Sequence, residues 1–481
     1  MLEERGPSGS EAVAAYTEVL ARYGRVLDFD ISALDHLGVP VTSCSLLVDG
    51  LIAQNGNGYG LTHDAARLSG LGELAEGVLA AERVRDLRSR ERRASFAELV
   101  RREGTDRVVH PATLCLPAGS PWDPETVLTW VPLVRVRTGE EVWAPLDLVA
   151  SDPGDRDDLV EPLLVTPVTN GLGAGLDDER PLAHGILEIL QRHTNGLRFR
   201  ALDARSPEID PAGLDGEVAA LAARFAAEGV EPVFKHAATA FGVCSTYVLG
   251  VDADDASPVR LTACGEAADP SSGRSLLKAL LEHANSRARK AFCFGDRGAA
   301  RAVADPDYWS AVERGGATGE PRAVAAMRAW HDLGPDALRA LTAPDRSRTV
   351  ERADVEVPEP AGGGSTLAGL LSSLGDHDVL AATARVGEVR VAKVLVTGLE
   401  VETLSYGRIG ELGAADLLGT DLDLVRRGDG PTATHPDRVL LTPAAEQRLG
   451  GPVWYSYAVA EGIVGARYPL YREPPRHLVE V

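Results

Sequence analysis

The chain has 481 residues, and its 49 basic and 71 acidic side chains give a formal net charge of −22. Nucleic-acid-binding proteins and proteins held on anionic lipid need a basic surface, so this balance excludes both classes. Hydrophobic residues at 44% and charged residues at 25% are typical of a folded chain with a large core. No long apolar run or basic N-terminal segment indicates a membrane span or a signal peptide, and we expect a cytoplasmic protein.

The first 28 residues contain a short helical pattern at 11–23, which predicts an N-terminal helical appendage because the segment is too short for its own core. Residues 37–48 are apolar and rich in β-branched side chains, as expected of a strand. A long helix is predicted at 62–88. Residues 105–150 follow with strand patterns, notably 125–136 and 140–149.

A glycine-rich segment at 169–175, TNGLGAG, precedes a second predicted helix at 178–193. Its GxGxG spacing differs from the dinucleotide fingerprint. Two interpretations stay open: its backbone N–H groups approach an anion, or it forms a tight glycine turn without a ligand.

Residues 217–251 and 367–400 share a helix–strand–strand pattern, and both resemble the strand at 37–48. This repetition predicts an α+β fold, a mixed helix and sheet domain built from helix–strand–strand units. A third helix is predicted at 273–290, between the two copies. We therefore expect a main domain over 29–417, with a variable insertion at about 295–365.

The tail at 418–481 concentrates aromatic side chains, which are favoured anchors at protein interfaces. These side chains either pack the tail onto the main domain or form a docking surface for a partner protein. The residues are Trp454, Tyr455, Tyr457, Tyr468 and Tyr471.

Each long predicted helix carries polar side chains on one stripe. On the first helix, Ser69, Glu73 and Glu76 lie within roughly 60° of one another, because a helix turns every 3.6 residues. The corresponding groups on the other two helices are Glu188, Gln191 and Arg192, and then Glu282, Asn285, Ser286 and Arg287.

Such stripes are either the solvent-facing sides of amphipathic helices or the lining of a cleft. Carboxylates that converge from separate helices repel one another unless a cation lies between them. Mg²⁺ with a nucleotide phosphate chain is a common solution, and arginines then pair with phosphate oxygens. A structural network of glutamate and arginine would use the same residues. The HExxH, GxSxG and GxxxxGK[ST] motifs are absent, which removes the commonest zinc-protease, serine-hydrolase and P-loop interpretations.

At these stripes the chain resembles the YcaO family, over roughly residues 30–416. The similar segments, in order, are ALDHLGVPVTS at 33–43, GYGLTHDAARLSGLGELAE at 58–76, TNGLGAGLDDERPLAHGILEILQR at 169–192, DPSSGRSLLKALLEHANSR at 269–287 and VTGLEVETLSYGRIG at 396–410.

The resemblance implies a mixed α+β domain that binds ATP and Mg²⁺ at acidic helices. It implies ATP-dependent modification of a peptide backbone amide by a cyclodehydratase that forms azolines, the precursors of thiazole and oxazole rings, or by a related enzyme that forms thioamides or amidines. The substrate would be a ribosomally made precursor peptide. The ATP residues carried over are Ser69, Glu76, Arg192 and Arg287, and the metal residues are Glu73, Glu188 and Glu179.

Four positions depart from the family pattern. Tyr59 stands where the family has a lysine, Leu176 and Arg180 stand where it has an asparagine and a glutamate, and Gln191 replaces the second glutamate of Glu-x-x-Glu-Arg. Lost carboxylates and an added cation weaken a metal site built on acidic oxygens, with Glu179 as a candidate substitute.

Two functions therefore stay open, an active backbone-modifying enzyme and a catalytically degenerate homologue that serves as a binding or scaffold subunit. For the enzyme we expect a separate leader-binding protein as partner, and a homo-oligomer is compatible with the sequence. The family often ends in a proline-rich tail that approaches the site, but residues 473–481 hold only Pro474 and Pro475, so we assign them no such role.

Overall fold

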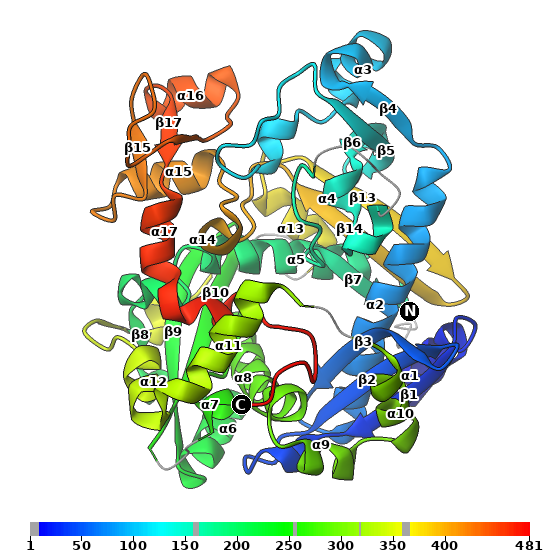
Figure 1. Cartoon of the computed structure of the whole chain (residues 1–481), viewed down its shortest axis with the longest axis vertical. Coiled ribbons are helices and arrows are strands. Elements are labelled where there is room, and N and C mark those ends of the chain that lie inside the picture. The colour runs from blue at the N-terminus through cyan, green and yellow to red at the C-terminus, as the bar shows by residue number, and fades with distance from the viewer. Residues whose placement is uncertain (1–8, 157–162, 254–256, 317–318, 358–365) are drawn as a thin grey trace, which may run out of the picture.

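The computed structural model describes residues 9–156, 163–253, 257–316, 319–357 and 366–481. Three long helices lie between three β-sheets, and a smaller fourth sheet belongs to the tail. Figure 1 shows α5 across the middle of the molecule, with one sheet above it and the other two below. The predicted mixed α+β fold is confirmed. The three helices are α2 (His63–Arg88), α5 (Arg180–Asn195) and α8 (Ser272–Phe294).

The N-terminal sheet is antiparallel, in the order β1-β2-β3. Gly56 and Gly58 of β3 let α2 approach closely, because a Cβ on Gly58 would lie 2.0 Å from the carbonyl oxygen of Ala66. The first strand begins inside the segment predicted as an appendage, and α1 buries Leu20 against the core. The elements are α1 (Gly9–Leu20), β1 (Arg25–Asp30), β2 (Val41–Val48) and β3 (Leu51–Tyr59).

The five-stranded sheet has the order β11-β10-β9-β8-β12, and α6 and α8 pack on it. Gly265 of β11 brings α8 close, since a Cβ there would lie 2.1 Å from the carbonyl oxygen of Ala279. The elements are β8 (Glu208–Ile209), α6 (Gly216–Ala227), β9 (Val230–Ala240), β10 (Val243–Asp252), α7 (Pro258–Leu261), β11 (Cys264–Asp269) and β12 (Thr349–Val350).

The six-stranded sheet has the order β4-β5-β13-β14-β7, with β6 on β5, and α5 packs on β7 and β14. Both predicted helix–strand–strand units exist, as α6-β9-β10 and α13-β13-β14. The strand predicted at 140–149 ends at Pro145, which lacks the N–H for further pairing. The elements are β4 (Arg92–Ser95), α3 (Phe96–Glu103), β5 (Val127–Arg135), β6 (Glu141–Pro145), α4 (Leu146–Val149), β7 (Leu172–Gly175), α13 (Leu367–Ser373), β13 (Val379–Val386) and β14 (Val389–Val396).

The predicted insertion is largely helical and has its own buried aromatic side chains, Tyr308, Trp309 and Trp330. Its glycine-rich end, 358–365, lies outside the described residues. The helices are α9 (Arg297–Val303), α10 (Pro306–Arg314), α11 (Pro321–Leu333) and α12 (Pro335–Thr342).

The C-terminal tail packs onto the main domain, so the docking-surface interpretation is wrong for those of its aromatic side chains that are buried. Tyr455 and Tyr468 are buried, and the hydroxyl of Tyr471 donates to the carbonyl of Phe199. Tyr457 is half exposed, and its hydroxyl donates to the carbonyl of Ala118. The elements that complete the chain are α14 (Thr403–Tyr406), α15 (Glu411–Leu418), β15 (Val425–Arg427), β16 (Asp437–Arg438), α16 (Pro443–Leu449), β17 (Val453–Tyr455) and α17 (Tyr457–Val464).

After α17 the chain turns back to the middle of the molecule, where Figure 1 shows it in red beside α8. The N–H groups of His477 and Val481 donate to the carbonyls of Cys293 and Phe294, at the end of α8. The end of the tail therefore packs against the C-terminal end of α8. Among the helices that the structure describes, none combines the length and the apolarity that crossing a bilayer requires.

Candidate functional site

Four glutamates on the three long helices make the same type of contact: each accepts a hydrogen bond from a backbone N–H of a neighbouring strand or loop. Such a bond fixes one carboxylate oxygen and thereby orients the other. The bonds run from Asn57 N to Glu73 at 2.8 Å, and from Ala174 N to Glu76, Gly171 N to Glu188 and Glu266 N to Glu282, each at 2.9 Å.

The close helix–strand packing explains these bonds. Glycines on β3, β7 and β11 place no side chain between the strand and the helix that packs on it. The glutamates of that helix can therefore reach the backbone N–H groups of the strand. At Gly173 a Cβ would lie 2.1 Å from the carbonyl oxygen of Pro181 in α5. The segment 169–175 thus serves as a surface for close packing, and its N–H groups bind carboxylates of the protein itself.

The carboxylates are close enough to repel one another. Burial raises the pKa of Glu76 well above its usual value, and the charges of Glu188 and Glu73 raise it further. Burial of its carboxyl also raises the pKa of Glu73, although the residue as a whole is exposed on α2. Burial together with the charge of Glu266 raises the pKa of Glu282 to about 7. This arrangement favours a cation or protons between the helices.

Arg192 lies close enough to Glu188 and Glu282 to lower the pKa of both carboxyls. Its Nη1 lies 3.0 Å from Oε1 of Glu266, and Asn195 donates to the other oxygen of Glu266 at 2.9 Å. Burial lowers the pKa of Arg192, but the charges of Glu266 and Glu188 outweigh burial and raise it overall. Tyr59 belongs to the same cluster, because after burial the charge of Glu282 contributes most to its raised pKa.

A cavity of about 330 Å³ lies next to Arg192, a size typical of small-ligand sites. Its polar lining comes from α5, from β11, from α8, from the segment after β14 and from the tail, and its described lining residues include none of α2. Within it, Arg289 pairs with Glu473. The charged lining residues are Arg192, Glu266, Glu282, Arg289, Lys290, Glu402 and Glu473.

Two predictions are corrected here. Arg287 does not face the cleft: its side chain is 1% exposed, and it donates to Asp35 at 3.0 Å and to Asp252 at 3.2 Å. The sequence also led us to assign residues 473–481 no role at the site, whereas Glu473 lines the cavity.

The remaining predicted residues lie around the cleft without joining the glutamates. Ser69 is exposed on α2. Glu179 is exposed at the start of α5, where its N–H donates to Asp177 at 3.0 Å. Arg180 is exposed too, yet it lies near enough to Glu76 to lower the pKa of that carboxyl. Leu176 packs in the apolar cluster beneath α2, and Gln191 is partly buried on α5.

Sequence reasoning missed Arg289, Glu402, Glu266 and Glu473. Helical periodicity could have found the first, because seven residues bring Arg289 back to the face of Glu282, whereas five residues turn Arg287 away by roughly 140°. Glu473 carried no local signal, since only the tertiary fold brings the tail to α8.

The side chains present fit a nucleotide with Mg²⁺. The Arg192 Nε and the Asn285 Oδ1 are buried and have no hydrogen-bond partner within the described residues, so polar groups are left for a ligand. In that same part of the chain no three acidic, histidine or cysteine side chains form a ready metal cluster. Mg²⁺ usually takes one or two carboxylates and completes its shell with phosphate and water, so such a cluster is not required.

Comparisons with known proteins bear on the fold and on the family of the chain. A relative, an uncharacterized protein of Methanothermobacter thermautotrophicus, is 27% identical over 83% of this chain and 96% of its own length. The structure of YcaO from Methanopyrus kandleri bound with AMPPCP and Mg²⁺ is similar with a TM-score of 0.58 at 21% identity, over 84% of this chain and 95% of that one.

A heterocyclase in complex with substrate and cofactor has a TM-score of 0.62 at 16% identity, and the likeness covers 87% of this chain but only 56% of that one. Both structural likenesses concern the fold. The family model described as YcaO cyclodehydratase, ATP- and Mg²⁺-binding, matches residues 57–400, which is more than half of the chain. The chain therefore belongs to the YcaO family, which confirms the expected cofactors, ATP and Mg²⁺, at the level of the family.

Proposed function

We propose that this protein binds Mg²⁺-ATP in the cleft between α2, α5 and α8 and uses it to modify a backbone amide of a ribosomally made peptide. One observation carries the proposal: glutamates from three helices, Glu73, Glu188 and Glu282, each accept a hydrogen bond from a backbone N–H, and the charges of all three raise the pKa of Tyr59. Within this group the charges of Glu188 and Glu73 raise the pKa of Glu76, a repulsion that a bound cation would relieve.

In this proposal Glu73 and Glu188 supply the carboxylate oxygens of the metal, phosphate and water complete its shell, and Glu76 lies beside the nucleotide. Arg192 binds phosphate oxygens, and Arg289 takes the phosphate-side role expected of Arg287. Bound ATP supplies the phosphoryl group that makes the amide oxygen a good leaving group. The chain itself contributes orientation and charge neutralisation.

The substrate we propose is a precursor peptide, and the product is an azoline or a related thioamide or amidine. A separate leader-binding protein would capture that peptide.

The test is a calorimetric titration with a non-hydrolysable ATP analogue in the presence and absence of Mg²⁺. We expect Mg²⁺-dependent binding, and loss of it in Glu188→Gln, which removes a charged ligand. Glu82→Gln is the matched control, because Glu82 lies on α2 and pairs with Arg85 outside the cleft. Equal binding by Glu188→Gln and the wild type would rule out the assigned ligand, and no binding by the wild type would refute the proposal.

The second function, a degenerate scaffold subunit, is favoured by one observation: Arg180 lies close enough to Glu76 to lower the pKa of that carboxyl. If this charge weakens the metal site, Arg180→Glu with Gln191→Glu should tighten Mg²⁺-nucleotide binding. Partly exposed charges contribute about 1 kcal/mol, which corresponds to about fivefold in affinity. Unchanged affinity in the double variant would count against the degenerate site.

A further inference from the structure

Lysine is rare in this chain, with four lysines against 45 arginines, yet three of the four are buried. Lys235, Lys290 and Lys393 each donate to a backbone carbonyl oxygen. A compact ammonium fits where a planar guanidinium does not, so a lysine kept at a buried position in this composition indicates a specific task.

Lys393 on β14 lies near Glu188, one of the glutamates of the candidate site. Its side chain is buried, and Nζ donates to the carbonyl oxygens of Val168 and Asn170, at 2.5 and 2.9 Å. Burial lowers the pKa of Lys393 to about 7, and the nearby Glu188 carboxylate opposes that effect. The lysine and the proposed metal ligand therefore influence each other's charge.

A single peptide unit connects the two side chains. The carbonyl of Asn170 and the N–H of Gly171 belong to the same planar group, and in a trans peptide they point in opposite directions. Lys393 binds the carbonyl end, and the N–H end donates to Glu188 at 2.9 Å. Rotation of this unit would break both bonds at once.

Gly171 makes this orientation specific. Its φ of +85° lies in the region that favours glycine, and a Cβ there would lie 2.3 Å from the carbonyl oxygen of Val394. The N–H of Val394 in turn donates to the Gly171 carbonyl at 2.7 Å. Val394 thus fixes Gly171 next to this peptide unit, and the ammonium group of Lys393 binds the carbonyl oxygen of the unit itself.

We propose that Lys393 is a positioning residue: through the Asn170–Gly171 peptide it sets the direction in which Glu188 presents its carboxylate to Mg²⁺. This inference rests on the proposed function. Groups that orient a metal ligand from behind typically change metal affinity by about 10- to 100-fold when removed.

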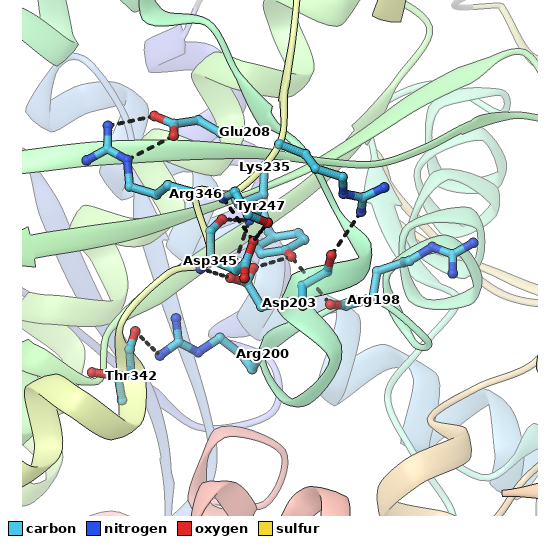
Figure 2. Close-up of polar contacts among 12 residues, drawn as sticks. Arg198, Arg200, Asp203, Glu208, Lys235, Tyr247, Thr342, Asp345 and Arg346 are labelled. Carbon is cyan, nitrogen blue, oxygen red and sulfur yellow. Dashed lines mark hydrogen bonds and ion pairs between the residues drawn. The ribbon is translucent and has the colours of Figure 1, made fainter. Parts of the chain in front are cut away.

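Lys235 provides a matched control. It is equally buried and caps the carbonyl of Asp345, in a cluster with Asp203 and Tyr247 that ties the loop before β12 to β9 and β10. Figure 2 shows these side chains converging around Lys235. None of them belongs to the glutamate cluster. Lys235→Met therefore tests the general cost of losing a buried lysine.

The experiment measures Mg²⁺-dependent binding of a non-hydrolysable ATP analogue together with amide hydrogen exchange of the free proteins. In Lys393→Met we expect about 10- to 100-fold weaker binding and faster exchange at residues 171–174. Lys235→Met should keep the wild-type affinity and the wild-type exchange in that segment.

Lys393→Gln, which retains a donor for one carbonyl, should lose less affinity and carries the test if the Met variant does not fold. Wild-type affinity with wild-type exchange at 171–174 in a folded Lys393 variant would overturn the inference. An equal loss in Lys235→Met would overturn it too. Failure of the wild-type protein to bind the analogue refutes the proposed function as well, whereas the other two results leave that function standing.

Discussion

Glu473 of the C-terminal tail and Arg289 of α8 form a two-armed ion pair in the wall of the cavity. The Nη1–Oε2 distance is 2.6 Å and the Nη2–Oε1 distance is 3.0 Å, and Lys290 lies 3.5 Å from the same carboxylate. Although burial acts to raise the pKa of Glu473, Arg289 and Lys290 lower it to about 2. The tail is therefore attached to the helix that carries Glu282.

Glu473→Gln should destabilise the protein and loosen the tail. Removing one partner of a charged hydrogen-bonded pair costs about 2 kcal/mol. We expect no larger loss because both side chains of this pair are partly exposed to solvent. Because the folded pKa lies below the unfolded one, the stabilisation is present above about pH 4.5 and disappears as the pH falls toward 2. Urea unfolding at pH 7 and pH 3 checks this, since the gap between wild type and variant should shrink in acid. A constant gap would contradict the assignment.

His477 should make the protein sensitive to mild acid. Burial, with smaller contributions from Arg476 and Arg297, lowers its pKa to about 3, and its ring shares a 2.8 Å hydrogen bond with the Tyr308 hydroxyl. The unfolded state binds the proton more readily, so stability falls as the pH drops below about 6.5. One unit lower, the loss is about 1.4 kcal/mol.

The check is thermal unfolding at pH 7.5 and pH 5.5. The variant His477→Asn tolerates the positive φ of 61° at this position and removes the titrating group. It should show a smaller difference between the two pH values than the wild type does. The same difference in both proteins would place the acid sensitivity elsewhere.

Gly265→Ala should disturb the candidate site by pushing α8 away from β11. A Cβ there would lie 2.3 Å from the N–H of His283, so α8 must move away from β11 and weaken the bond between Glu266 N and Glu282. Overpacking of this kind costs about 1–3 kcal/mol, and we expect weaker Mg²⁺-nucleotide binding as well.

The matched control is Gly72→Ala, where a Cβ on α2 would meet nothing within 4 Å. Alanine in a helix interior is favoured over glycine by about 0.5–1 kcal/mol, so this variant should be slightly more stable and bind normally. Denaturant unfolding and nucleotide titration of both variants decide the matter. Intact binding by a folded Gly265→Ala would show that the packing is not needed for the site.

Arg287→Met should unfold the protein more readily without acting on the site directly. The change leaves Asp35 and Asp252 without the buried cation they face, and breaking a buried pair costs about 3–5 kcal/mol. In osmolyte, where the variant should still fold, nucleotide affinity should stay near that of the wild type. Arg289→Met should show the opposite pattern, with weaker binding and a smaller loss of stability. A folded Arg287→Met without nucleotide affinity would restore the phosphate role to Arg287.

Elements with strong local signals could be predicted from the chain alone. The helix predicted at 62–88 agrees with α2 to within one residue, and the 3.6-residue periodicity placed Glu73 and Glu76 on one face. The order of short segments was enough to indicate the YcaO family and the mixed fold. These features depend on neighbours in the chain, so a single sequence carries them.

Only the tertiary structure decided which charges meet. Arg287 and Arg289 are two residues apart on one helix, yet one is buried with Asp35 and the other faces Glu473, and all these partners are distant in sequence. The role of Lys393 depends in the same way on a peptide unit more than two hundred residues earlier. Charge pairing is set by distance in space and by burial, and neither is encoded in local periodicity.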